Sequence, residues 1–143
     1  NLTTHQLFPR KVVVACSRDY LDSHRIESYA DLNGKTLLVH EKSEDSWGNW
    51  AKEVGILPPV PGKLLRSDSM SAIAHAAQQG LGIGLISWPL GRHWFSSESL
   101  VRVFDEEVAT GNHFYVALRS EDAARQDVRE LRDWVIEKFR DFA

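Results

Sequence analysis

The sequence predicts a mixed α/β fold. Two observations support this prediction, namely the alternation of strand-like and helix-like segments and the composition. Short apolar runs alternate along the 143 residues with amphipathic segments of helical period. This order is typical of α/β domains and favours mostly parallel pairing of the strands. The apolar fraction of 43% is ordinary for a globular protein and excludes wholesale disorder. No apolar run approaches the roughly 20 residues of a membrane-spanning helix, so we expect no membrane partner.

Charge and cysteine content narrow the class of function. The net charge of −3 gives the chain no general electrostatic attraction to nucleic acid. The single cysteine, Cys16, cannot form an internal disulfide, which is typical of a reducing compartment. The sequence begins at Asn1 without a signal peptide or an initiating Met. We therefore expect a cytoplasmic protein of which this chain is one piece.

The first half of the chain is expected to hold two strands and one helix. Residues 11–16 form an apolar, β-branched run typical of a buried strand, and residues 36–40 form the next one. Residues 43–55 place apolar side chains at helical spacing, and Gly55 is suited to end that helix. Three prolines exclude regular structure from residues 56–62.

The second half predicts a capped helix among further strands. Residues 63–66 are a strand candidate, and the polar residues 67–69 then open a helix that Gly80 ends. The remaining elements are predicted strands at 83–86, 100–104 and 113–118, a loop or short helix over 88–99, and a helix from 120 to 142.

The motifs that would support catalysis or cofactor binding are weak. The glycine-rich run from Gly80 to Gly84 follows a helix and enters a strand, whereas a phosphate-binding loop connects a strand to the next helix. The six histidines lack metal-ligand spacing, and no Gly-x-Ser-x-Gly elbow is present. We therefore expect no enzyme activity, no metal and no cofactor.

Two helix starts are the better candidates for binding. Asp68-Ser69-Met70 and residues 43–46 each open a helix directly after a strand, where open α/β folds bind small ligands at free amides and hydroxyls. Plain helix capping explains the same residues. The two tryptophans of the first helix, Trp47 and Trp50, are equally explained as core or interface residues.

Taken in order, these segments resemble the effector-binding domain of the LysR-type transcriptional regulators. Residues 47–55 are similar to the W-x-x-W helix of the branch that contains the glycine-cleavage and β-lactamase-induction activators. The remaining matching segments are LFPRKVVVACSRDYL (7–21), YADL (29–32), LLVH (37–40), DSMSAIAHAAQQGLGIGL (68–85), LVRVF (100–104), YV (115–116) and VRELRDWV (128–135).

The resemblance implies a periplasmic-binding-protein-like (type II) fold of two α/β lobes around a crevice. On that fold, residues 10–112 would form the second lobe. Residues 113–143 would supply the crossover strand and the terminal helix that returns to the first lobe. The DNA-binding domain and most of the first lobe are expected to lie outside this chain.

The family's function is then expected here. A small-molecule effector would bind between the lobes, and DNA would be contacted only through an N-terminal winged helix-turn-helix of a homo-oligomer, either dimer or tetramer. A stand-alone periplasmic-type solute-binding protein is the alternative, and an enzyme on the same scaffold is a third possibility. The residues that match the family's effector site are Ser69, Asp68, Met70, Ser46, Trp47, His113 and Tyr115.

Overall fold

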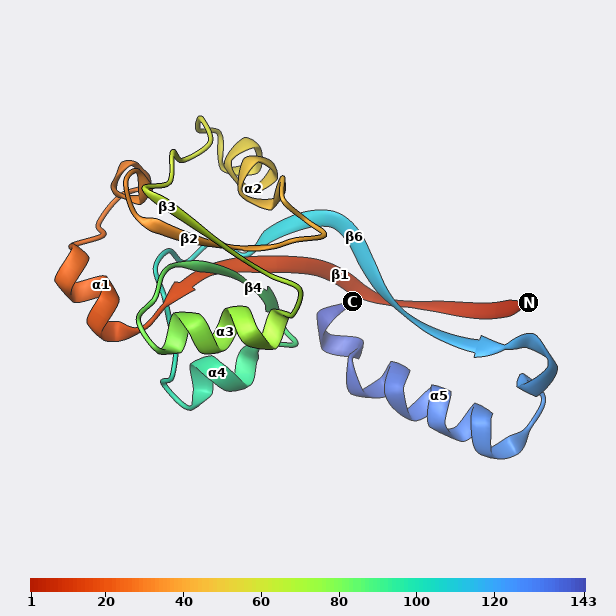
Figure 1. The fold of residues 1–143 in the computed structure, drawn as a ribbon. Helices are drawn as coiled ribbons and strands as arrows, with labels where there is room; N and C mark the ends of the chain where they lie inside the picture. Colours follow the sequence, from red (N-terminus) through yellow and green to blue (C-terminus); the bar gives the residue numbers. More distant parts are fainter. The chain divides into compact units, whose positions relative to one another are not determined.

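The computed structural model describes residues 1–143, which divide into two compact units (Figure 1). Unit 1 contains residues 1–10 and 109–143, and unit 2 contains residues 11–108. Two strands pass from one unit to the other, namely β1 (Leu2–Cys16) and β6 (Val108–Arg119). None of the helices is long and apolar enough to cross a membrane.

Unit 2 is built on a mixed sheet. Within it, β2 (Thr36–His40) pairs in parallel with β3 (Lys63–Ser67), and a parallel bridge from Leu37 to Ile83 leads on to β4 (Gly84–Trp88). The first strand, β1, runs antiparallel to β4 and to the short β5 (Val101–Arg102).

The predicted parallel pairing is therefore right for β2, β3 and β4 and wrong for β1. A strand that is buried on both faces shows the same apolar run in either direction, so its sequence does not reveal which way it runs. The predicted strand over residues 100–104 is also too long, since only two of its residues pair with β1.

Side chains on the two faces of this sheet form two separate cores. Along β1, Val12, Val14 and Cys16 join one core, while Val13 and Ala15 join the other. This alternation follows from the period of two in a strand. The first core is completed by α2 (Ser46–Val54) and the second by α3 (Met70–Gln78), and Figure 1 shows these helices on opposite sides of the strands.

The remaining elements of unit 2 are short. They are α1 (Arg18–His24), the 3-10 helix η1 (Tyr29–Leu32) and α4 (Arg92–Ser96). The predicted α3 and its end at Gly80 are confirmed, because Gly80 has a φ of 76° just beyond the helix. The predicted helix over 43–55 begins only at Ser46, whose N–H donates to the Ser43 carbonyl (3.0 Å) in a preceding turn.

In unit 1, the first part of β1 pairs with β6, and the unit also contains a terminal helix, α5 (Gln126–Lys138). The Asn1 carbonyl accepts from the Ser120 N–H, and the Arg10 carbonyl accepts from the Thr110 hydroxyl. Because the start of β1 lies beside the end of β6 in this way, the two strands run antiparallel. Phe8 is buried there, with its ring centroid 5.0 Å from those of Phe114 and Phe139.

Two predictions in unit 1 are wrong. The strand β1 starts at Leu2 rather than at residue 11. The terminal helix does not run unbroken from residue 120 to 142, because η2 (Ser120–Asp122) precedes α5 and η3 (Arg140–Phe142) follows it. The Asp122 carboxylate pairs with both Arg119 and Arg125, which stabilises a turn ahead of α5.

Candidate functional site

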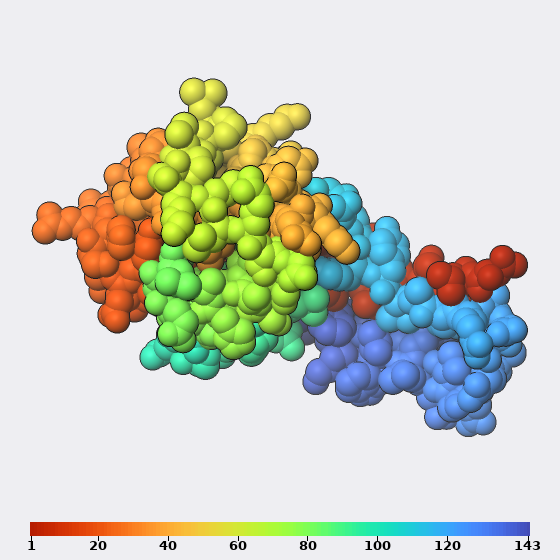
Figure 2. Space-filling model, in the orientation of Figure 1, coloured from red at the N-terminus to blue at the C-terminus, as the bar shows by residue number.

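Two helices begin beside one another at the carboxyl ends of β2 and β3. His40 and Ser67, the last residues of these strands, are paired in register. The Glu41 N–H donates to the Ser67 carbonyl (2.9 Å) and extends the ladder by one step. The chain then turns into α2 and α3, and Figure 2 shows the atoms of these two segments adjoining on one face of unit 2. As predicted, each of the two helices follows a strand, and the two strands end at the same edge of the sheet.

The start of α3 is capped by Ser69, as the sequence predicts. The Ser69 Oγ accepts from the Ala72 N–H (3.3 Å), and the Ser69 N–H donates to the Ser67 Oγ (3.2 Å). The first amides of a helix lack partners inside the helix, so the Met70 and Ser71 N–H groups are available to a ligand. A half-buried serine beside free amides can bind a small polar molecule.

Asp68 and Met70 flank the cap. Asp68 is exposed and makes no hydrogen bond or ion pair, whereas Met70 is half-buried and packs against the core beneath α3. A charged and an apolar side chain therefore stand on either side of the Ser69 hydroxyl. Their contact with an effector stays a prediction.

The start of α2 is held differently. Asp45 occupies the N-cap position without a side-chain cap bond, and Ser46 is the first, half-buried residue of the helix. The Arg66 Nε donates to the Glu44 Oε1 (2.5 Å), joining the end of β3 to the loop before α2. Both side chains are more than half exposed, so this pair adds little stability. It does show that the two loops are neighbours.

Trp47 lies in the core beneath the helix start. Its side chain is only 5% exposed, and its indole Nε1 donates to the Leu38 carbonyl (3.0 Å) in β2. The indole N–H is thus already paired, which favours the core role over direct contact with a ligand. Trp47 fastens the first turn of α2 to the sheet.

His113 and Tyr115 lie on β6 in unit 1, while the two helix starts belong to unit 2. His113 is half-buried and Tyr115 is 53% exposed, with their ring centroids 6.5 Å apart. In unit 2, the loop before α2 and the loop before α3 are neighbours, whereas Trp47 and Met70 pack into separate cores. The union of the unit 2 candidates with His113 and Tyr115 in one site stays a prediction.

Sequence reasoning missed the polar groups that shape the loops at this edge. The His40 Nδ1 accepts from the Lys42 N–H (3.1 Å), which fixes the loop after β2. The partners Glu44 and Arg66 are separated by 22 positions, and no spacing rule relates them before the pairing of β2 with β3 is known. Only a correct prediction that β2 pairs with β3 would have indicated that Glu44 and Arg66 are neighbours. The His, Cys, Asp and Glu side chains nowhere gather in threes that could hold a metal ion.

Two helix starts at the carboxyl ends of neighbouring parallel strands are a place where open α/β folds bind small ligands. The chain belongs to the LysR substrate binding domain family, whose sequence model matches residues 1–140. The effector domains of this family have the periplasmic-binding-protein-like type II fold, and the expected fold class is thereby confirmed.

The curated relatives are transcriptional regulators. The chain is 31% identical over 134 residues to the transcriptional activator AmpR of Pseudomonas aeruginosa, covering 92% of this chain and 43% of that protein. It is 30% identical over 126 residues to AmpR of Enterobacter cloacae, covering 87% of this chain and 42% of that protein. The chain thus spans less than half the length of these relatives. The alternative of a stand-alone solute-binding protein is not favoured by these matches.

Solved structures agree with the family assignment. The effector domain of AmpR from Pseudomonas aeruginosa superposes with a TM-score of 0.82 at 26% identity, over 97% of this chain and 66% of that one. The AmpR effector binding domain from Citrobacter freundii gives a TM-score of 0.83 at 23% identity, over 98% and 68%. Full-length LysG of Corynebacterium glutamicum, solved with bound effector Arg, gives a TM-score of 0.66 at 14% identity. This match covers 95% of this chain and 46% of the LysG chain.

Proposed function

We propose that this chain is the effector-sensing part of a LysR-type transcriptional regulator. It binds a small molecule at the starts of α2 and α3, and the complete protein controls transcription through a winged helix-turn-helix that binds DNA. The regulator acts as a homo-oligomer in the bacterial cytoplasm. The observation that most supports this is the capped α3 start beside the α2 start, at the carboxyl ends of β2 and β3, in a chain of this family.

The proposed ligand contacts at the two helix starts belong to unit 2. Ser69 and Ser46 offer hydroxyls, and the free amides of α3 favour an electronegative group. Asp68 offers a carboxylate to a group that donates hydrogen bonds. His113 and Tyr115, on β6 of unit 1, are separate candidates for a ligand contact. Such a ligand changes transcription only if it binds one arrangement of the protein more tightly than another.

The site is tested by a thermal-shift screen of this chain against amino acids, small carboxylic acids and cell-wall fragments. A ligand at 100 times its Kd stabilises the native state by about 2.7 kcal/mol. We expect Ser69→Ala to weaken the shift and Ser69→Trp to abolish it. Ser96→Trp serves as the matched control, because Ser96 is an exposed serine on α4. An unchanged shift in Ser69→Trp would remove Ser69 from the site.

The regulatory role has its own test. In the gene that encodes this chain, we expect the segment upstream of Asn1 to encode a winged helix-turn-helix. A signal peptide at that place would contradict the regulator and support a solute-binding protein instead.

A further inference from the structure

An aromatic cluster in unit 2 extends from the candidate site to the segment that leads into β6. Trp47, in the first turn of α2, meets Trp50 with ring centroids 5.6 Å apart. Trp50 stacks on Phe104 at 6.2 Å and meets Tyr29 edge-on at 5.5 Å. Tyr29 and Phe104 are themselves in edge contact at 4.7 Å. We call these four residues the aromatic bridge.

The far end of the aromatic bridge is tied to the loop between β5 and β6. The Tyr29 hydroxyl donates to the Glu106 Oε1 (2.7 Å), and this bond is the main cause that raises the pKa of Tyr29. The Arg102 guanidinium holds the same loop through the Asp105 carbonyl (3.0 Å) and the Glu107 carboxylate (3.1 Å). Loop residues 105–107 are exposed, so these polar contacts do more to hold the loop than burial does.

The near end of the aromatic bridge is anchored under the candidate site. The Trp47 indole bonds to the Leu38 carbonyl, so a shift of the first turn of α2 displaces Trp47 against its neighbours. Close-packed interiors have low compressibility and transmit such displacements. Val108, where β6 begins, is buried in the same core as Trp47 and Trp50.

We propose that the aromatic bridge couples the α2 start of the candidate site to the loop from which β6 leaves unit 2. It is the route by which ligand binding at that helix start changes the strand that leads out of the unit. The role of the ligand rests on the proposed function, but the coupling itself is a property of the ligand-free chain. It can therefore be measured even if no effector binds.

The experiment is hydrogen–deuterium exchange of the ligand-free chain, followed by mass spectrometry of segments 46–54 and 103–110. Tyr29→Phe removes the hydroxyl and keeps the ring, and Glu106→Ala removes its acceptor. Loss of a hydrogen bond worth about 1 kcal/mol corresponds to roughly fivefold faster exchange. We expect both variants to increase exchange about fivefold in segment 103–110 and also, measurably, in segment 46–54.

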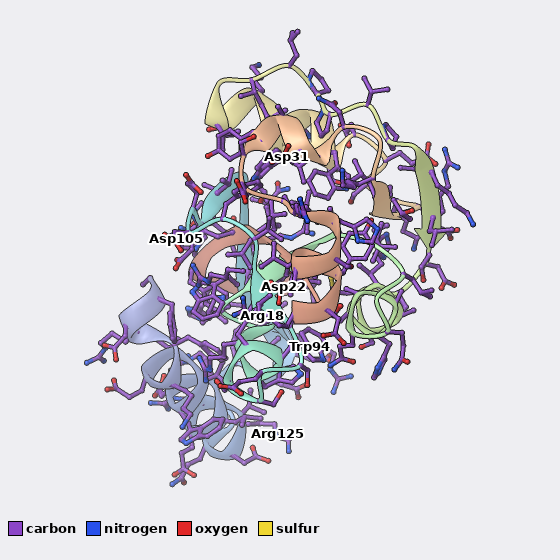
Figure 3. The ribbon with its side chains drawn as sticks, turned by 90° about the vertical axis from the view of Figure 1, so that its left-hand side faces the viewer. Arg18, Asp22, Asp31, Trp94, Asp105 and Arg125 are labelled. Atoms are coloured by element: carbon purple, nitrogen blue, oxygen red, sulfur yellow. The ribbon has the colours of Figure 1, made fainter.

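Asp105→Ala is the matched control, because Asp105 lies in the same loop with an exposed side chain that makes no bond (Figure 3). We expect it to leave segment 46–54 unchanged. Exchange in α3 reports any general loss of stability and is subtracted. The coupling is refuted if Glu106→Ala leaves segment 46–54 unchanged, or if Asp105→Ala accelerates it equally. Neither result bears on whether an effector binds at Ser69, which the thermal-shift screen decides.

Discussion

Replacing Trp47 by phenylalanine measures how firmly the start of α2 is fastened to the sheet. The indole N–H donates to the Leu38 carbonyl at 3.0 Å, and the side chain is 5% exposed. Trp50, on the same helix, is 2% exposed and makes no side-chain hydrogen bond. Trp→Phe removes the same atoms at both positions, so Trp50→Phe shows the cost of the smaller ring at a buried tryptophan of α2 that has no hydrogen bond to lose.

The Trp47 variant loses a hydrogen bond in addition to the ring atoms. A net bond is worth about 0.5–1.5 kcal/mol, and leaving a buried carbonyl short of its donor costs about 1–3 kcal/mol. We therefore expect Trp47→Phe to lower the free energy of unfolding by about 1–3 kcal/mol more than Trp50→Phe. Urea unfolding followed by circular dichroism provides the measurement, with equal m-values as the condition for comparing midpoints. Equal losses in the two variants would refute the claim that Trp47 fastens α2.

Four further outcomes follow from the glycines and the cysteine. Gly48→Ala should stabilise the chain by about 0.5–1 kcal/mol in urea unfolding, because Gly48 lies within α2 with no atom within 4 Å of the added Cβ. Gly62→Ala should destabilise it by more than about 1 kcal/mol in the same assay, because its Cβ would meet the Gly34 carbonyl oxygen at 2.3 Å. Burial raises the pKa of the Cys16 thiol to about 12, so a maleimide should label Cys16 only after unfolding. Since the unfolded thiol ionises from about pH 9, urea midpoints should fall as the pH rises from 9 towards 12.

Local patterns predicted the elements whose contacts are close in sequence. Residues 36–40 form the expected strand with the expected bounds, and Ser69 caps α3 through an amide only three residues away. Both depend on side-chain period and capping chemistry, which a short window contains.

The elements that the sequence did not predict depend on distant partners. The first part of β1 contains polar Thr3 and Thr4 and is interrupted by Pro9, so no apolar run marks it. It forms a strand because it pairs with β6, more than 100 positions away in the chain. Likewise, no local rule relates Tyr29 to Glu106, which are separated by 77 positions. The Ser69 cap of the candidate site was therefore predictable, whereas the contact between Tyr29 and Glu106 was not.

The direction of β1 explains why one capping serine belongs to the candidate site and another does not. Ser17 caps α1 as Ser69 caps α3, each accepting from the amide three residues on. In a fully parallel sheet, both serines would follow strand ends at the same edge. Because β1 runs against β4, Ser17 lies at the opposite edge, where its hydroxyl is 3.7 Å from the Cβ position of Gly80, just beyond the far end of α3. Strand direction, which the apolar pattern does not encode, thus separates the Ser17 cap from the Ser69 cap at the candidate site.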